Sequence, residues 1–162
     1  MSELEVYLGI DTSCYTTSVA FMDRQANLVG ESRQILKVHE GKCGLQQSEM
    51  VFQHTRNLPE MIKNAMPRGA KIIGVCASGY PRPLPDSYMP AFLVGAGLAR
   101  SVSVLNNIPL WLISHQENHL LAGEWSAGGP DDERFLFLHA SGGTTDLLTA
   151  EKDGSGSYKL TE

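Results

Sequence analysis

A strand-rich segment that occurs twice is the feature that most constrains the fold of this chain. Residues 5–31 have the pattern of a strand, a hydroxyl-rich turn, a second strand, a hairpin and a third strand, and residues 134–162 repeat this order. The Thr-Thr pair at 16–17 in the first copy corresponds to the pair at 144–145 in the second. Because repeated supersecondary patterns indicate a duplicated unit, we expect a complete first lobe and only the opening strands of a similar second lobe.

The segment between the two copies predicts alternating helices and strands. Apolar residues at helical spacing mark a helix over 50–65, and the continuous apolar run at 70–77 is typical of a buried strand. The same reasoning places a strand at 109–113 and helices at 91–105 and 115–125. Three strands with tight connections pair antiparallel, and strand–helix–strand units extend a sheet in parallel. The predicted fold is therefore α/β, a mixed-sheet lobe of the actin-like, sugar-kinase and ribonuclease-H-like class.

A linker is predicted at residues 128–133, where two glycines and a proline precede acidic residues. This boundary gives a first lobe at 1–127 and, at 134–162, the first three strands of a truncated second lobe. In this architecture a nucleotide lies between two lobes, and the opening turn of each lobe supplies a phosphate loop. Since one fold hosts many functions, the expectation of a nucleotide depends on the residues in those turns.

Composition excludes several classes of protein. The chain has three cysteines and no Cys-x-x-Cys pair, which argues against a disulfide framework or a thiolate zinc site and favours a cytoplasmic protein. No apolar run approaches the roughly 18 residues that cross a bilayer, and the acidic N-terminus is unlike a signal peptide. The formal net charge of −5 is unlike that of a free-standing nucleic-acid binder. Contact with RNA would therefore need a local basic patch, a missing part of the protein or a partner protein.

The sharpest local motif, Ser-His-Gln-Glu-Asn-His at 114–119, follows a predicted strand and opens a helix. His115 and His119 stand at i and i+4, so their Cβ atoms lie about 6 Å apart and the two imidazoles can share one cation. The alternative is structural, because Ser114 and Glu117 have the spacing of a helix capping box. Two histidines are also an incomplete metal site, so we expect a third ligand outside this chain.

Two turns at equivalent points of the repeat are candidate phosphate loops. The paired glycines at 142–143 can present backbone N–H groups as an anion nest, although on their own they favour an ordinary tight hairpin turn. The acid and hydroxyls at 11–13 could orient magnesium-bound water or phosphate oxygens, although they also suit an Asx turn. The predicted nucleotide or substrate residues are Asp11, Thr12, Ser13, Ser141, Gly142, Gly143, Thr144 and Thr145.

Three further polar residues have simpler interpretations. His54 lies on the apolar face of a predicted helix and His139 within a buried strand, so both are expected to be structural. Arg82, in a proline-rich loop, is the basic residue best placed to meet a phosphate.

Five segments match the motifs of one known family, in the same order along the chain. They are Leu-Gly-Ile-Asp-Thr-Ser-Cys at 8–14, Lys-Val-His…Gly at 37–44, Val-Gly…Ala-Arg-Ser at 94–101, His-x-Glu-x-His-Leu at 115–120 and Ser-Gly-Gly-x-Thr at 141–145. With these motifs the chain resembles the universal tRNA threonylcarbamoyladenosine transferase family (TsaD-type), formerly described as O-sialoglycoprotein endopeptidases or glycoproteases. The resemblance covers essentially the whole chain.

The resemblance implies a two-lobed ATP-binding protein with the actin-like fold. Its zinc or iron would be bound by His115 and His119 together with an aspartate from the second lobe. The metal would help hold a threonylcarbamoyl-adenylate whose carbonyl carbon is attacked by a tRNA adenosine amine. The resemblance also implies an adenine nucleotide with magnesium, a pocket lined by residues 141–145, and tRNA bound with the help of partner proteins. It assigns no catalytic residue.

Departures from the family pattern support a second hypothesis. Tyr15 and Thr16 stand where the family commonly has acidic residues, and the loop at 81–85 replaces a Gly-Pro-Gly loop. A non-catalytic paralogue that pairs with a true transferase would tolerate both changes. A metalloendopeptidase is less favoured, because the motif lacks the His-Glu-x-x-His order that places a general base beside the metal. These residues alone are expected to be inactive and, with unpaired strand edges, to self-associate.

Overall fold

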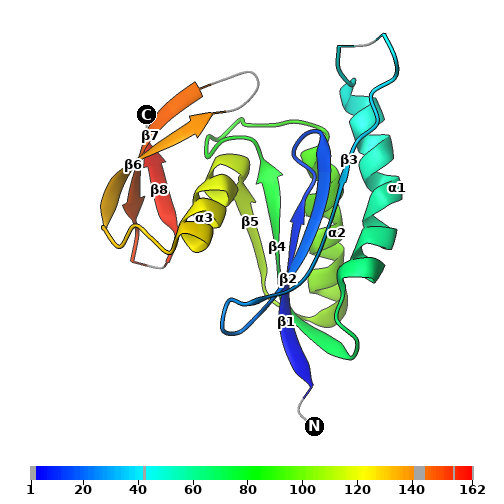
Figure 1. The fold of residues 1–162 in the computed structure, drawn as a ribbon, viewed down its shortest axis with the longest axis horizontal. Helices are drawn as coiled ribbons and strands as arrows, with labels where there is room; N and C mark the ends of the chain where they lie inside the picture. Colours follow the sequence, from blue (N-terminus) through cyan, green and yellow to red (C-terminus); the bar gives the residue numbers. More distant parts are fainter. Residues whose placement is uncertain (1–2, 42, 141–144, 155, 162) are drawn as a thin grey trace.

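The computed structural model describes residues 3–41, 43–140, 145–154 and 156–161. Three strands open the chain, alternating helices and strands follow, and three strands close it (Figure 1). The elements are β1 Leu4–Asp11, β2 Thr16–Asp23, β3 Leu28–Ile35, α1 Gln47–Ala65, β4 Ala70–Tyr80, α2 Phe92–Asn106, β5 Leu110–Ser114, α3 His115–Ala127, β6 Arg134–Ala140, β7 Thr145–Lys152 and β8 Tyr158–Thr161.

Two sheets form, and both have the predicted pairing. The first has the order β3-β2-β1-β4-β5, in which β1, β2 and β3 pair antiparallel and β4 and β5 are added in parallel. The second sheet, β6-β7-β8, is antiparallel throughout. Its three consecutive antiparallel strands match the arrangement of β1 to β3. The predicted α/β fold with a mixed sheet is therefore confirmed.

The helices cover the first sheet on both faces. The apolar core includes side chains of α1 and α2, and it contains Val6, Leu8 and Ile10, which alternate along β1. Because side chains alternate across a strand, Asp11 at the end of β1 points to the opposite face. That face lies against α3, which contacts β4, β5 and β6 and stands between the two sheets (Figure 1). The fold thus aims the carboxylate of Asp11 at α3.

Close packing of α2 against β1 depends on Gly95. A Cβ atom there would lie 2.9 Å from Oγ1 of Thr12 and 3.1 Å from Cγ2 of Ile10, both too near for an ordinary contact. Gly97, by contrast, has open space around it. Close approach of α2 to β1 therefore requires glycine at position 95 and not at position 97.

Strand β4 is three residues longer than predicted, and this extension reaches the site. The sequence predicts its end at Ala77, but an irregularity in the pairing with β5 continues the strand to Tyr80, opposite Ser114. The predicted linker at 128–133 falls between α3 and β6. Within the part of the chain that the structure describes, no helix is long and apolar enough to cross a membrane.

Candidate metal and ligand site

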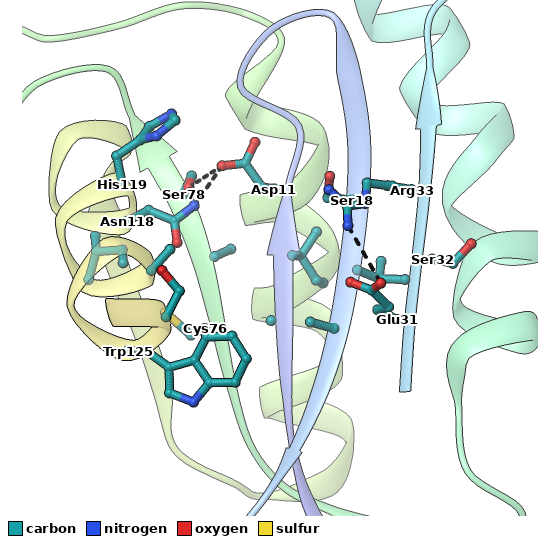
Figure 2. A pocket seen from close by; sticks show the side chains of 18 of the residues that line it. Asp11, Ser18, Glu31, Ser32, Arg33, Cys76, Ser78, Asn118, His119 and Trp125 are labelled. Atoms are coloured by element: carbon teal, nitrogen blue, oxygen red, sulfur yellow. Dashed lines mark hydrogen bonds and ion pairs between the residues drawn. The ribbon is translucent and has the colours of Figure 1, made fainter. Parts of the chain in front are cut away.

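A buried carboxylate, that of Asp11, lies at the centre of the site. Its Oδ1 accepts hydrogen bonds from the backbone N–H and the hydroxyl of Ser13, at 2.8 and 2.5 Å. Its Oδ2 accepts from Oγ of Ser78 at 2.7 Å and from Nδ2 of Asn118 at 2.8 Å (Figure 2). These donors fix the carboxylate in one orientation.

Asp11 is ionised at neutral pH despite its burial. Burial opposes the charged form, but the polar contacts from His115, Ser13 and Ser78 outweigh it and hold the pKa of this carboxyl well below its usual range. The site therefore contains a fixed negative charge at the end of β1.

The capping box positions the first histidine. Oγ of Ser114 accepts from the backbone N–H of Glu117 at 3.1 Å, and Oε2 of Glu117 accepts from the backbone N–H of Ser114 at 2.7 Å. This reciprocal pair starts α3 at His115, directly after β5. The imidazoles of His115 and His119 then stand one turn apart, with 3.0 Å between their Nε2 atoms.

A third histidine joins this pair. One ring nitrogen from each of His115, His119 and His139 lies within 4.8 Å of the other two. The strand position of His139 predicted a structural role, but its ring faces α3 and contributes to the cluster. In β6 the alternate residues Phe135 and Phe137 pack in the cluster around Leu120, and His139 continues that face.

Carboxylates stand behind two of the three imidazoles. Nδ1 of His115 lies 3.4 Å from Oδ2 of Asp11, and Nδ1 of His139 lies 3.8 Å from Oδ2 of Asp146. Both Nδ1 atoms are buried, and neither makes a hydrogen bond within the described residues. Asp146 is itself held by Nε2 of Gln116 at 3.0 Å and Nη2 of Arg82 at 3.1 Å. Arg82 thus reaches the site through an ion pair.

The environment favours neutral rings in this cluster. Burial lowers the pKa of both His119 and His139, and positive charge on His115 would lower both further. A neutral imidazole keeps a lone pair for a metal, whereas an imidazolium has none. The cluster therefore suits a cation ligand set.

A cavity of about 610 Å³ adjoins the cluster, within the size range of small-molecule sites. Asp11, Ser78, Asn118 and His119 line one part of it, and Trp125 of α3 lines another (Figure 2). The indole N–H of Trp125 donates to the backbone carbonyl of Ala26 at 3.0 Å. The carboxylate of Asp11 and the imidazole of His119 thus border the same open space, and His115 is not among the residues that line it.

The other predicted site residues have varied environments. Thr12 is fully buried, its hydroxyl donating to the carbonyl of Ala91 at 2.9 Å and accepting from the N–H of Gly95 at 3.1 Å, so it anchors α2 rather than facing the cavity. Ser13 is buried beside Asp11. Thr145 is exposed at the start of β7. The remaining predictions, Ser141, Gly142, Gly143 and Thr144, lie outside the described residues.

His54 has the structural role predicted for it. It is fully buried, with Nδ1 2.8 Å from the hydroxyl of Thr17 and Nε2 3.0 Å from the carbonyl of Cys14. Both ring nitrogens therefore have partners within the core.

Sequence reasoning missed Ser78, Asn118 and Asp146. Asn118 has a local signal, because it stands three residues after His115 and so shares a helix face with it. Ser78 directly follows Ala77, the last residue of β4 that pairs with β1, and polar residues at neighbouring parallel strand ends gather at one sheet edge. Asp146 has a cross-strand signal only, since it pairs with His139 in the β6–β7 register.

Comparison with known sequences supports the resemblance. Over 155 residues, 94% of its length, the chain is 32% identical to the tRNA N6-adenosine threonylcarbamoyltransferase of Aromatoleum aromaticum and covers 44% of that protein. The chain thus spans about half the length of the curated relative it matches. No family model matches the chain. The similarity to threonylcarbamoyltransferases inferred from the motifs is confirmed.

Comparison with solved structures supports the fold. YeaZ from Pseudomonas aeruginosa matches with a TM-score of 0.63 at 13% identity, over 98% of this chain and 65% of that one. A ROK family glucokinase from Streptomyces griseus, solved with glucose and AMPPNP, matches with a TM-score of 0.52 at 12% identity, over 96% and 46%. At these identities the likeness shows the fold alone, and it confirms the actin-like, sugar-kinase architecture.

Proposed function

We propose that this chain forms part of a threonylcarbamoyl-transferase-like protein of tRNA modification that binds a divalent metal and an adenine nucleotide. The observation that carries the proposal is the ionised, hydrogen-bonded Asp11, which lies beside the histidine pair and lines one cavity together with His119. The name of the relative with 32% identity supports the reaction class. Because the chain spans 44% of that relative, the activity is proposed for the whole protein, and these residues alone are expected to be inactive.

Asp11 is the residue best suited to a nucleotide with magnesium. Mg²⁺ prefers oxygen ligands and retains several waters, which a fixed carboxylate can orient next to phosphate oxygens. Asn118 and Ser78 hold Asp11 in place through its Oδ2 atom, so the charge needs no rearrangement on binding. The adjoining cavity would take the nucleotide, and the motif at 141–145 would contribute the second set of phosphate contacts.

The histidine pair fits zinc or iron. Two nitrogens on a tetrahedral zinc at about 2.1 Å are roughly 3.4 Å apart, close to the 3.0 Å between the Nε2 atoms of His115 and His119. A metal held there would act as a Lewis acid that polarises an oxygen of an acyl-adenylate. The rings themselves are oriented by the capped start of α3.

The acidic character of the chain bears on its partners and its place in the cell. A formal net charge of −5 is unlike that of a protein that grips RNA phosphates unaided. We therefore propose that tRNA is bound together with partner proteins. The proposed location is the cytoplasm, because the sparse cysteines suit a reducing compartment.

The test of nucleotide binding is equilibrium dialysis with labelled ATP and magnesium. Asp11→Asn removes the charge, and we expect affinity to fall at least about tenfold, since charge-assisted hydrogen bonds contribute about 1.5–3 kcal/mol. Asp131→Asn, at an exposed residue, is the matched control and should bind like the unaltered chain. Circular dichroism of both variants checks folding. Equal affinity of the two folded variants, or no ATP binding by the unaltered chain, would refute a nucleotide site at Asp11.

The alternative, a non-catalytic paralogue that pairs with a true transferase, is favoured by one observation. Both oxygens of Asp11 already accept two hydrogen bonds each from Ser13, Ser78 and Asn118. A carboxylate saturated in this way can maintain the fold without chemistry. Retained ATP affinity, with no threonylcarbamoylation of tRNA when the partner enzymes are supplied, would support this alternative.

A further inference from the structure

We propose that His139 supplies a third metal ligand, so that His115, His119 and His139 form a three-histidine site within this chain. The inference rests on the proposed function and deepens it. It replaces the expected need for a third ligand from outside the chain with a residue that the structure already places beside the pair. The three ligand nitrogens lie within 4.8 Å of one another, and small side-chain rotations would bring them onto one ion.

The two unpartnered ring nitrogens point to a ligand role. Histidines that bind metals generally donate the N–H of the second ring nitrogen to a carboxylate, a carbonyl or water. Nδ1 of His115 faces Asp11 at 3.4 Å, and Nδ1 of His139 faces Asp146 at 3.8 Å. A proton on each Nδ1 leaves the lone pair of Nε2 for the ion. Each of the two rings therefore has a carboxylate near its second nitrogen, although neither makes a hydrogen bond to it among the described residues.

Asp146 is positioned for this task by several contacts. It pairs directly with His139 across the β6–β7 ladder, so the backbone fixes their separation. Gln116 and Arg82 hold its carboxylate from the side of the first sheet. Helix α3 carries both His115 and His119. It also carries Gln116, which holds Asp146 and so helps to orient His139.

The ligand set defines the chemistry of the site. Three neutral nitrogens suit zinc or a similar first-row divalent ion. His115 is half-buried and His139 is buried, whereas His119 is exposed, so one side of the cluster is open. A fourth position on that side is available to water or to an oxygen of a ligand in the adjoining cavity, as in three-histidine sites that retain an open coordination position.

The experiment titrates the metal-free chain with Co²⁺ and records the visible absorption of the bound ion. We expect one equivalent to bind, His115→Ala to abolish tight binding, and His139→Ala to weaken it at least about tenfold. Asp146→Asn, which keeps all three rings, should weaken binding by roughly 10–100-fold. His39→Ala, at an exposed histidine, is the control and should bind like the unaltered chain.

X-ray absorption of the zinc-loaded, unaltered chain counts imidazole ligands without any substitution, and three are expected. A count of two imidazole ligands would overturn the three-histidine site, as would unchanged Co²⁺ affinity in a folded His139→Ala protein. Either result would leave the His115–His119 metal site of the proposed function intact. Failure of the unaltered chain to bind Co²⁺ or Zn²⁺ would overturn both.

Discussion

Individual buried groups decide the chemistry of this protein, and His54 gives a clear test at this scale. Burial lowers the pKa of His54, although the carbonyl of Cys14 opposes the shift. The folded state thus holds the ring neutral, and the unfolded chain binds the extra proton below its ordinary pKa of about 6.5. The contribution of His54 to the unfolding free energy is therefore fully present above that pH and is lost as the pH falls below it.

The measurement is urea unfolding at several pH values between 7.5 and 5, an interval chosen around the ordinary pKa of about 6.5. His54→Gln should reduce the loss of unfolding free energy over this interval, and His39→Gln, at an exposed position, should not. His119 and His139, whose pKa values are also lowered, leave a residual slope of the same sign. A slope unchanged by His54→Gln would contradict the assignment.

Local sequence patterns predict site residues that lie in one helix well, but they do not predict which residues of other elements pack beside them. The capping box and the i, i+4 histidines follow from one helix, so the sequence predicts Ser114, Glu117 and the His115–His119 pair. His139 meets that pair only because β6 packs against α3, and no sequence spacing reports the packing of an element twenty residues away. The sequence predicts Thr12 as a ligand-binding residue because of its neighbours in the turn. In the structure its hydroxyl instead makes hydrogen bonds with backbone groups at the start of α2.

At the scale of elements, the contact between α2 and β1 makes a sharp prediction. Gly95→Ala should lower the unfolding free energy by about 1–3 kcal/mol, because the new methyl group would overpack against Thr12 and Ile10. Gly97→Ala, two residues along the same helix in open space, should raise it by up to about 1 kcal/mol through helix propensity. Urea unfolding of both variants measures the difference. Equal stabilisation by the two substitutions would show that α2 is not closely packed at Gly95.

The helices and strands were predictable because the hydrophobic spacing of a strand and that of a helix are clearly distinct in this sequence. Strand alternation gave β1, β2 and the second sheet, and helical spacing gave α1 with an error of a few residues at its start. The end of β4 was misplaced because its last residues pair through an irregular register with β5, which depends on the neighbouring strand. The cavity could not be predicted, since it arises from the separation of α3 from β1 and β2.

At the scale of the whole molecule, the second sheet carries three exposed leucines on its outer face. Its inner face packs around Leu120, while Leu136, Leu138 and Leu147 on the outer face are 60–69% exposed. Leu138 and Leu147 are direct cross-strand partners, so these side chains form one continuous patch. Patches of this kind mark surfaces that become covered. We expect a second copy of the chain to cover this patch. The sequence predicts self-association through unpaired strand edges, and the patch adds a sheet face to that contact.

Sedimentation velocity over a range of concentrations tests this arrangement. The unaltered chain should sediment faster as concentration rises, and Leu138→Lys should shift it towards the monomer, because a charge in a buried apolar contact is costly to desolvate. Leu105→Lys is the matched control, since Leu105 is 84% exposed near the end of α2 and belongs to a different surface. A monomer at every concentration would refute self-association, and an equal effect of both substitutions would place the contact elsewhere. If the metal site is intact in the Leu138→Lys monomer, the three histidines of one chain suffice for the ion and the contact between copies has a separate, structural role.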